Sequence, residues 1–188
     1  MKKIILGSNS PRRRELLAGL DIDFTVDTGN SFEERLEPGV EAHQVPVQLS
    51  AGKSHGFHRP LAEDEVLITS DTVVIVDQEV LGKPHSREEA VEMLRKLSGR
   101  AHEVVTAVTI RDCEREETFS VSTQVHFEML TQAEIDHYID KYRPYDKAGA
   151  YGIQEWIGYV GISAIEGSFY NVMGFPVHRV WHALQRFL

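Results

Sequence analysis

The most apolar run of the chain, residues 66–76, reads V-L-I-T-S-D-T-V-V-I-V and is rich in β-branched residues. Such a run is typical of a strand that is buried on both faces of a sheet. Asp71 lies in its middle, where an unpaired carboxylate would be costly, so it needs cations, hydrogen bonds or solvent beside it. Two interpretations stay open. Asp71 either caps a bend in a locally amphipathic strand, or the strand carries it to the floor of an active site.

In the rest of the chain, short apolar runs typical of strands alternate with segments in which apolar residues recur at helical spacing. Strands are predicted over residues 3–6, 22–26, 66–76, 79–81, 102–111, 119–129 and 159–165. Helices are predicted after Ser10, within residues 40–57, over 86–97 and 131–142, and after Pro176; capping boxes start the third and fourth at Ser86/Glu89 and Thr131/Glu134. Because strict βαβ repetition and linkers are lacking, the pattern predicts an α/β fold, a mixed sheet with flanking helices in one domain, residues 1–188.

The first strand leads into a helix through the turn G-S-N-S-P, residues 7–11. Ser10 suits the N-cap and Pro11 suits the first helical position, where its missing N–H costs nothing. Backbone N–H groups and the positive dipole end then favour an anion at this turn. The arginines at 12–14 oppose the dipole, so either a bound polyanion compensates for them or they are simply solvated.

Composition narrows the class of protein. The chain is 41% hydrophobic and 26% charged, as ordinary globular proteins are, and its net charge is -9. That balance argues against a nucleic-acid polymer as partner, although a single nucleotide needs only a few local cations. Cys113 has no partner for an internal disulfide, its acidic neighbours mark it as a surface thiol, and neither a signal peptide nor a membrane span is evident. We therefore expect a cytoplasmic protein without a membrane partner.

Polar groups at the junctions between elements carry the candidate chemistry. They are Ser8, Ser10, Arg12, Arg13, Glu34, Lys53, Asp71, Lys83, Lys147 and Gln154. Arginine and lysine can hold a polyphosphate, while carboxylates can hold Mg²⁺ or Mn²⁺ and orient or deprotonate a water molecule. The chain has neither a Walker A motif nor a zinc-ligand motif. The residues favour a metal-assisted phosphoanhydride hydrolase or a nucleotide-binding protein, without deciding between them.

Several strings in order along the chain resemble the Maf family of nucleoside triphosphate pyrophosphatases. They are S-N-S-P-R-R at 8–13, S-A-G-K at 50–53, S-D-T-V-V at 70–74, G-K-P at 82–84, L-S-G-R-A-H-E-V-V-T-A-V at 97–108, D-K-A-G-A-Y-G-I-Q at 146–154 and I-E-G-S-F-Y-N-V-M-G-F-P at 165–176. Each string alone is weak evidence for the resemblance. Together the strings are highly specific for this family, and they cover nearly the whole chain.

The resemblance implies an elongated α/β fold with a mixed twisted sheet and a deep cleft between two lobes, as in the inosine triphosphate pyrophosphatases. It also implies a reaction, in which a nucleoside triphosphate and water give the monophosphate and pyrophosphate with a divalent metal, Mg²⁺ or Mn²⁺. The strings S-D-T-V-V and G-A-Y-G-I-Q resemble those of members that act on dTTP and UTP. The 7-methyl-GTP group typically has glutamine where this chain has Thr72.

The resemblance assigns roles to individual residues. Asp71 matches the family's proton acceptor, and Arg12, Thr72 and Gln154 match its specificity positions. The groups that match its phosphate-binding positions are Ser8, Arg12, Arg13, Lys53 and Lys83. Glu34 resembles the carboxylate that shares the metal with Asp71, but the local string N-S-F-E-E leaves the choice between Glu33 and Glu34 open. Gly52 departs from the family's usual alanine-rich helix and weakens it.

Two other functions compete with hydrolysis of dTTP and UTP. One is a pyrophosphatase for a modified nucleotide such as 7-methyl-GTP, and the other is a nucleotide-binding regulator of cell division without turnover. The final helix and the apolar residues of the hairpin at 102–129 could support a homodimer, as in the family.

Overall fold

The computed structural model of the chain describes residues 2–35 and 38–188. These residues form two compact units. Unit 1 contains the described residues of 1–72, 106–121 and 174–188, and unit 2 contains residues 73–105 and 122–173. The chain passes from one unit to the other directly after residues 72, 105, 121 and 173, so adjacent residues belong to different units at these points.

The described residues form a seven-stranded mixed sheet with flanking helices, as the sequence predicts. The strands are β1 (Lys3–Leu6), β2 (Phe24–Val26), β3 (Glu65–Val76), β4 (Glu79–Leu81), β5 (Ala101–Arg111), β6 (Glu116–Phe127) and β7 (Ile162–Glu166). Their order is β2-β1-β3-β5-β6-β7, and β4 pairs with β3. The helices are α1 (Pro11–Ala18), α2 (Val45–His55), α3 (Arg87–Leu97), α4 (Gln132–Tyr142), α5 (Trp156–Gly161), α6 (Phe169–Val172) and α7 (Val177–Leu184), with short 3₁₀ turns η1 (Ala42–Gln44) and η2 (Ala148–Ala150).

The central strand β3 pairs with different partners along its length. Its first part runs parallel to β1, up to the pair Leu6–Ile68, and its last part runs antiparallel to β4 from the pair Val74–Leu81. Between these two pairings, residues 69–73 face neither β1 nor β4. Asp71 lies on this stretch, so its neighbours along that edge are side chains and loops rather than a strand.

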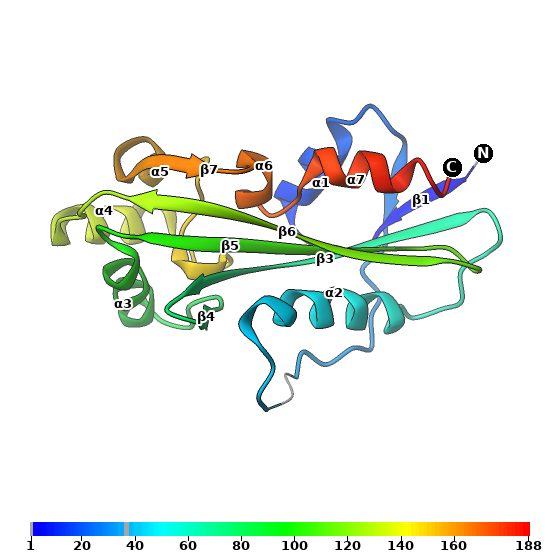
Figure 1. Ribbon diagram of the computed structural model, residues 1–188, viewed down its shortest axis with the longest axis horizontal. Helices are drawn as coiled ribbons and strands as arrows, with labels where there is room; N and C mark the ends of the chain where they lie inside the picture. The colour runs from blue at the N-terminus through cyan, green and yellow to red at the C-terminus, as the bar shows by residue number, and fades with distance from the viewer. Residues whose placement is uncertain (1, 36–37) are drawn as a thin grey trace. The chain divides into compact units, whose positions relative to one another are not determined.

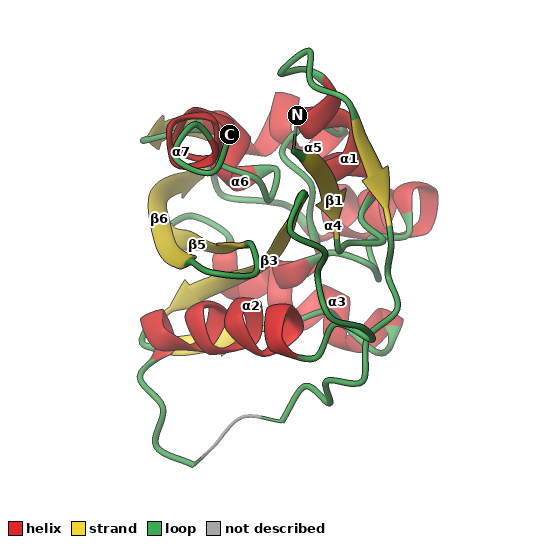
Figure 2. Cartoon of the chain, turned by 90° about the vertical axis from the view of Figure 1, so that its right-hand side faces the viewer, coloured by secondary structure: helices red, strands yellow, loops and turns green. Residues whose placement is uncertain are grey.

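In unit 1, helices cover both faces of the sheet. Figures 1 and 2 show α1 and α7 on one face and α2 on the other. Leu6 and Ile68 pack with Leu17 of α1 and Leu184 of α7, while the alternate residues Ile5 and Leu67 pack with Phe57 and Leu61 after α2. Successive side chains of a strand point to opposite faces of the sheet, so a strand that is covered by helices on both faces needs apolar residues at successive positions.

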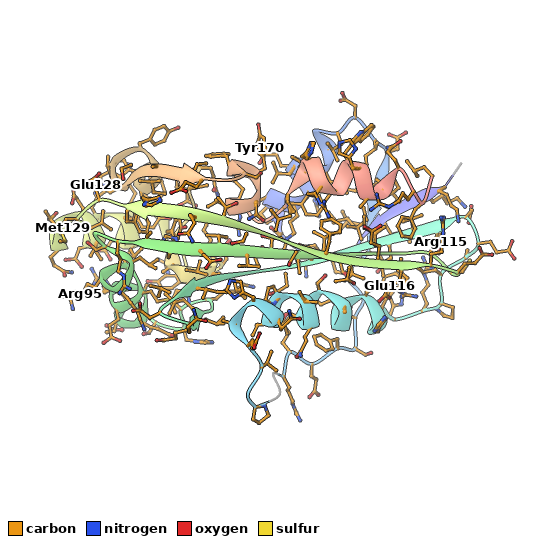
Figure 3. The ribbon with its side chains drawn as sticks, viewed as in Figure 1. Arg95, Arg115, Glu116, Glu128, Met129 and Tyr170 are labelled. Carbon is orange, nitrogen blue, oxygen red and sulfur yellow. The ribbon has the colours of Figure 1, made fainter. Side chains whose placement is uncertain are left out.

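In unit 2, α3, α4 and α5 share one hydrophobic core with the strands. Its largest fully buried members are Leu94, Leu97, Ile135, Tyr138, Ile139 and Ile157. Thr131 starts α4 with the predicted capping box. Ser86 also caps α3, but the Glu89 carboxylate accepts from the N–H of His85 instead of closing a box. The side chains of Met129 and Tyr170 are exposed to solvent (Figure 3).

Three predicted elements differ from the structure. The predicted strand over 159–165 is a helix up to Gly161 and a strand only from Ile162. A Cβ at Gly158 would lie 1.8 Å from the carbonyl oxygen of Ile153, so only glycine permits this tight start of α5. The run at 167–176 also contains the short helix α6, which is capped by Ser168 and too short to show a helical period. The strand predicted to start at 119 starts at Glu116.

No helix among the described residues is both long and apolar enough to cross a bilayer.

Candidate active site

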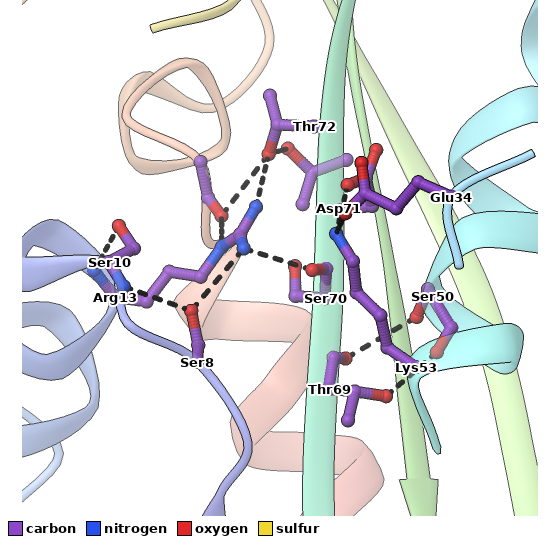
Figure 4. A network of polar contacts seen from close by, with 12 residues as sticks. Ser8, Ser10, Arg13, Glu34, Ser50, Lys53, Thr69, Ser70, Asp71 and Thr72 are labelled. Carbon is purple, nitrogen blue, oxygen red and sulfur yellow. Dashed lines mark hydrogen bonds and ion pairs between the residues drawn. The ribbon is translucent and has the colours of Figure 1, made fainter. Parts of the chain in front are cut away.

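Lys53 and Glu34 form a charged cluster with Asp71 in unit 1. The Nζ atom of Lys53 lies 2.6 Å from Oδ1 of Asp71 and 2.8 Å from Oε1 of Glu34. The Asp71 side chain is 13% exposed, whereas that of Glu34 is 59% exposed. One ammonium group therefore joins a carboxylate from β3 to a carboxylate from the loop before α2 (Figure 4). Its charge offsets the repulsion between the two carboxylates.

Buried hydroxyl groups dock α2 on the sheet and so place Lys53 beside Asp71. Ser50 Oγ lies 2.9 Å from Oγ1 of Thr109, and the hydroxyl of Thr69 donates to the carbonyl oxygen of Ser50 at 2.9 Å. Ser50 is fully buried and precedes Lys53 by three residues, so both lie on the same face of α2. Because a buried hydroxyl without a partner is costly, these bonds favour one position of α2 along β3.

The loop that carries Glu34 is held against α2 by side chains that the sequence does not mark as functional. The Nδ2 group of Asn30 donates to the carbonyl oxygen of Lys53 at 2.6 Å. The ring of Phe32 lies over Gly52, where an added Cβ would be only 2.3 Å from the ring carbon Cε2. Gly52 lies inside α2, and its bare Cα makes room for Phe32 and so brings Glu34 to Lys53.

The turn between β1 and α1 has the predicted geometry. Ser10 caps α1 by accepting from the N–H of Arg13 at 3.4 Å, and Pro11 is the first helical residue. Ser8 Oγ accepts from the backbone N–H of Ser10 at 3.2 Å, which closes the turn. Arg12 lies beside Pro11 in this first turn of α1.

The guanidinium group of Arg13 reaches β3 on the side opposite to Lys53 (Figure 4). It donates to the carbonyl oxygens of Gly174 and Ser70, both at 2.9 Å, to Thr72 Oγ1 at 3.0 Å and to Ser8 Oγ at 3.5 Å. Burial lowers the pKa of Arg13 from its ordinary value, and the nearby charge of Asp71 acts in the opposite direction. Arg13 thus ties the first turn to β3 and to the segment before α7.

Asp71 and Glu34 suit a divalent metal ion. Both converge on one cationic group, and carboxylate oxygens are the ligands that Mg²⁺ and Mn²⁺ prefer. Glu33 instead pairs with Arg35 at 2.7 Å, so the contacts favour Glu34 over Glu33. No set of three or more acidic, histidine or cysteine ligands occurs within residues 2–35 and 38–188. Mg²⁺ in proteins commonly completes its shell with water and substrate phosphates.

Lys83 and Gln154 belong to unit 2. Lys83 is exposed and follows Gly82, whose carbonyl oxygen accepts from the N–H of Gly149 at 3.0 Å. Gln154 lines a cavity of about 310 Å³, with Tyr159, Phe169 and strand β7 around it. Its Oε1 atom is buried and has no hydrogen-bond partner.

The segment before Gln154 is anchored by two buried tyrosines. Tyr138 accepts from the N–H of Gly152 at 3.0 Å and donates to the carboxylate of Glu155 at 2.9 Å. Tyr151 shares a 2.6 Å hydrogen bond with Nε2 of His102. Burial lowers the pKa of His102 to about 4, so the imidazole is neutral at neutral pH. These contacts hold the backbone on both sides of residue 152.

Comparison with known proteins identifies the family. The model of the family described as "Maf-like protein" matches residues 3–187. The chain belongs to the Maf family. It is 51% identical over 187 residues to a protein of Porphyromonas gingivalis and 49% identical over 185 residues to one of Parabacteroides distasonis, both named dTTP/UTP pyrophosphatase. Each alignment covers 98% of this chain, and 94% and 96% of the respective relatives.

A solved structure with little sequence similarity has a related fold. The HAM1 protein from Coxiella burnetii is 13% identical, with a TM-score of 0.51 over 99% of this chain and 100% of its own. At that identity the likeness concerns the fold alone. It agrees with the expected mixed sheet and flanking helices, while the deep cleft between two lobes stays a prediction.

The structure brings together most of the Maf-like residues that fall in unit 1. Ser8, Arg13 and Thr72 share one network, and Lys53, Asp71 and Glu34 share the other (Figure 4). Sequence reasoning missed the groups that hold these residues, namely Asn30, Phe32, Ser50, Ser70, Thr106 and Gly174. Gly52 was a signal for Phe32 alone, because an unexplained glycine inside a helix often marks close packing.

Proposed function

We propose that this protein hydrolyses nucleoside triphosphates, dTTP and UTP foremost, to the monophosphate and pyrophosphate. Water attacks the α-phosphorus, the bond from that phosphorus to the oxygen bridging the β-phosphate breaks, and pyrophosphate leaves. Relatives at 42–51% identity named dTTP/UTP pyrophosphatase support this reaction. The observation that carries the proposal is the pair of carboxylates, Asp71 and Glu34, around a single cation.

Asp71 acts as the proton acceptor for the attacking water. Its side chain is mostly buried and held by one hydrogen bond from Lys53, which leaves carboxylate lone pairs for a water molecule. Asp71 and Glu34 together would hold Mg²⁺ or Mn²⁺. When bound, the ion would neutralise charge on the phosphates during bond cleavage.

The cationic residues bind the triphosphate. We assign direct phosphate contacts to Arg12, Lys53 and Lys83, with Ser8 as a hydroxyl donor in the first turn. Lysine suits this role because its ammonium is a mobile point charge with three donors. The start of α1 adds backbone N–H groups and a favourable dipole.

Thr72 and Gln154 act on the choice of base, together with Arg12. The Gln154 amide has both a donor and an acceptor, and uracil and thymine present an N–H between two carbonyl oxygens. The cavity beside Gln154 is lined mainly by apolar residues, which suits a planar ring.

A substrate panel tests the proposed reaction. Pyrophosphate release is measured with Mg²⁺ or Mn²⁺ from dTTP, UTP, CTP, GTP and 7-methyl-GTP at equal concentrations. Preference for dTTP and UTP is expected. Preference for 7-methyl-GTP or another nucleotide would keep the mechanism and overturn the substrate, whereas binding without any release would indicate a regulator.

We further propose that the protein forms a homodimer and acts in the cytoplasm. The exposed Trp181 on α7 supports an interface on the final helix. Sedimentation equilibrium of the protein and of Trp181→Glu tests this assignment. A dimer that the substitution dissociates is expected, and a monomer at all concentrations would overturn it.

A further inference from the structure

The hydrogen bonds of Arg13 leave little of its side chain for a ligand. An arginine has five N–H donors, and four of them are used by Ser8, Ser70, Thr72 and Gly174. The bonds to Ser70 and Thr72 come from different terminal nitrogens of the same guanidinium group. A bidentate grip on a phosphate would therefore require Arg13 to release β3.

The two bonds from Arg13 to β3 flank the residue that we propose as proton acceptor. Ser70 contributes its backbone carbonyl and Thr72 contributes its hydroxyl, so the guanidinium spans the chain on both sides of Asp71. Because side chains alternate along a strand, the Asp71 carboxylate points to the opposite side, where Lys53 holds it (Figure 4). Arg13 and Lys53 thus restrain this part of β3 from opposite sides.

The hydroxyl of Thr72 is also fully engaged. It accepts from Arg13 at 3.0 Å, lies 2.9 Å from the hydroxyl of Thr106 and lies 3.4 Å from the carbonyl oxygen of Gly174. A hydroxyl has one donor and two acceptor sites, so these three contacts use its whole capacity. Thr72 therefore influences the choice of base through the position of Arg13 and its neighbours, and not through a hydrogen bond of its own to the base.

We infer that Arg13 is a positioning residue, which works with Thr72 to hold the backbone around Asp71 rather than gripping the phosphates. The inference rests on the proposed function, because it concerns the placement of the proposed proton acceptor. Misplacement of a reacting group by about 1 Å can cost on the order of 100-fold in rate. A positioning role therefore affects kcat, whereas loss of a phosphate ligand would mainly raise KM.

The test compares four variants in steady-state pyrophosphate release from UTP. Arg13→Lys keeps the charge but cannot span Ser70 and Thr72, and Thr72→Val removes the acceptor, while Thr72→Ser keeps it. Arg59→Lys is the matched control, because Arg59 grips Glu65 at the start of the same strand through two nitrogens, at 2.6 and 3.0 Å. Thermal unfolding of each variant is recorded in parallel.

For Arg13→Lys and Thr72→Val, kcat is expected to fall about tenfold or more while KM changes less than about threefold. Thr72→Ser is expected to recover kcat to within about threefold of the wild type, and Arg59→Lys to keep both constants. A tenfold rise in KM with unchanged kcat in Arg13→Lys would overturn the inference.

Two further outcomes keep the test decisive. If Arg13→Lys does not fold, the Thr72 pair decides alone, and wild-type kcat in Thr72→Val would overturn the inference. If the wild type releases no pyrophosphate from any triphosphate, the proposed function fails first, and the positioning role fails with it. If the wild type is active, a negative result concerns Arg13 and Thr72 only.

Discussion

The substitution Gly52→Ala should separate stability from activity. Alanine favours a helix interior over glycine by about 1 kcal/mol, so the change strengthens α2 considered alone. The new methyl group, however, would lie 2.3 Å from two ring carbons of Phe32. Ordinary contacts between carbon atoms begin near 3.5 Å, so the ring has to retreat by about 1 Å.

That retreat acts on the proposed metal site through the loop that carries Glu34. Glu34 is two residues after Phe32, and its carboxylate lies 2.8 Å from Lys53. A shift of about 1 Å breaks this ion pair and withdraws one of two carboxylates from the proposed metal. Loss of a supporting contact of this kind typically costs about 10- to 100-fold in metal affinity or activity. The gain in helix propensity and the lost packing of Phe32 offset each other, so stability should change by less than about 1 kcal/mol.

The assay measures kcat with UTP across a titration of Mn²⁺, together with urea unfolding. We expect the half-saturating Mn²⁺ concentration to rise about tenfold or more in Gly52→Ala. The clash needs the ring, so Gly52→Ala in the background of Phe32→Ala should add little to the effect of Phe32→Ala alone. Wild-type metal dependence in Gly52→Ala, or additive effects in the double variant, would refute the packing argument.

Three other predictions concern the support of the site. Ser50→Ala removes one of the two hydroxyl partners of Thr109, the other being Thr118, and should lower the free energy of unfolding by about 1 kcal/mol in urea titrations, whereas an unchanged value would show that the hydroxyl network is dispensable. The buried His102 has a pKa of about 4 against an ordinary 6.5, so the unfolded chain binds the extra proton. The contribution of neutral His102 to the free energy of unfolding should be fully present above pH 6.5 and should be lost as the pH falls from 6.5 to 4. His102→Gln should remove this part of the pH dependence. Gln154→Ala should reduce the preference for UTP over CTP about tenfold or more in kcat/KM, and an unchanged preference would exclude Gln154 from base selection.

Local signals in the sequence predicted the elements that depend on local chemistry. Ser10, Pro11 and Thr131 start their helices as predicted, because capping needs only the next three residues. The buried strand around Asp71 was equally clear from its run of β-branched residues. Tyr159 and Val160 favour a strand by type but lie in α5, because β-branched and aromatic side chains occur in helices whenever packing favours them.

Contacts between distant residues could not be predicted from the sequence pattern. Lys53 looks like an ordinary surface lysine until α2 is placed on β3, and that placement depends on Ser50 and Thr109, 59 residues apart. The resemblance to the Maf family marked Lys53 and Asp71 as site residues, but it gave neither the contact between them nor the role of Gly52. That role depends on Phe32, whose ring occupies the space that a larger side chain would need.

The central claim is that Asp71 accepts the proton from the water that attacks a nucleoside triphosphate. The most direct measurement compares the wild type with Asp71→Asn in pyrophosphate release from UTP with Mg²⁺, and in UTP binding by calorimetry. We predict that release falls by about 10²- to 10⁴-fold, while the Kd for UTP stays within about threefold. Full pyrophosphate release by Asp71→Asn would contradict the assignment.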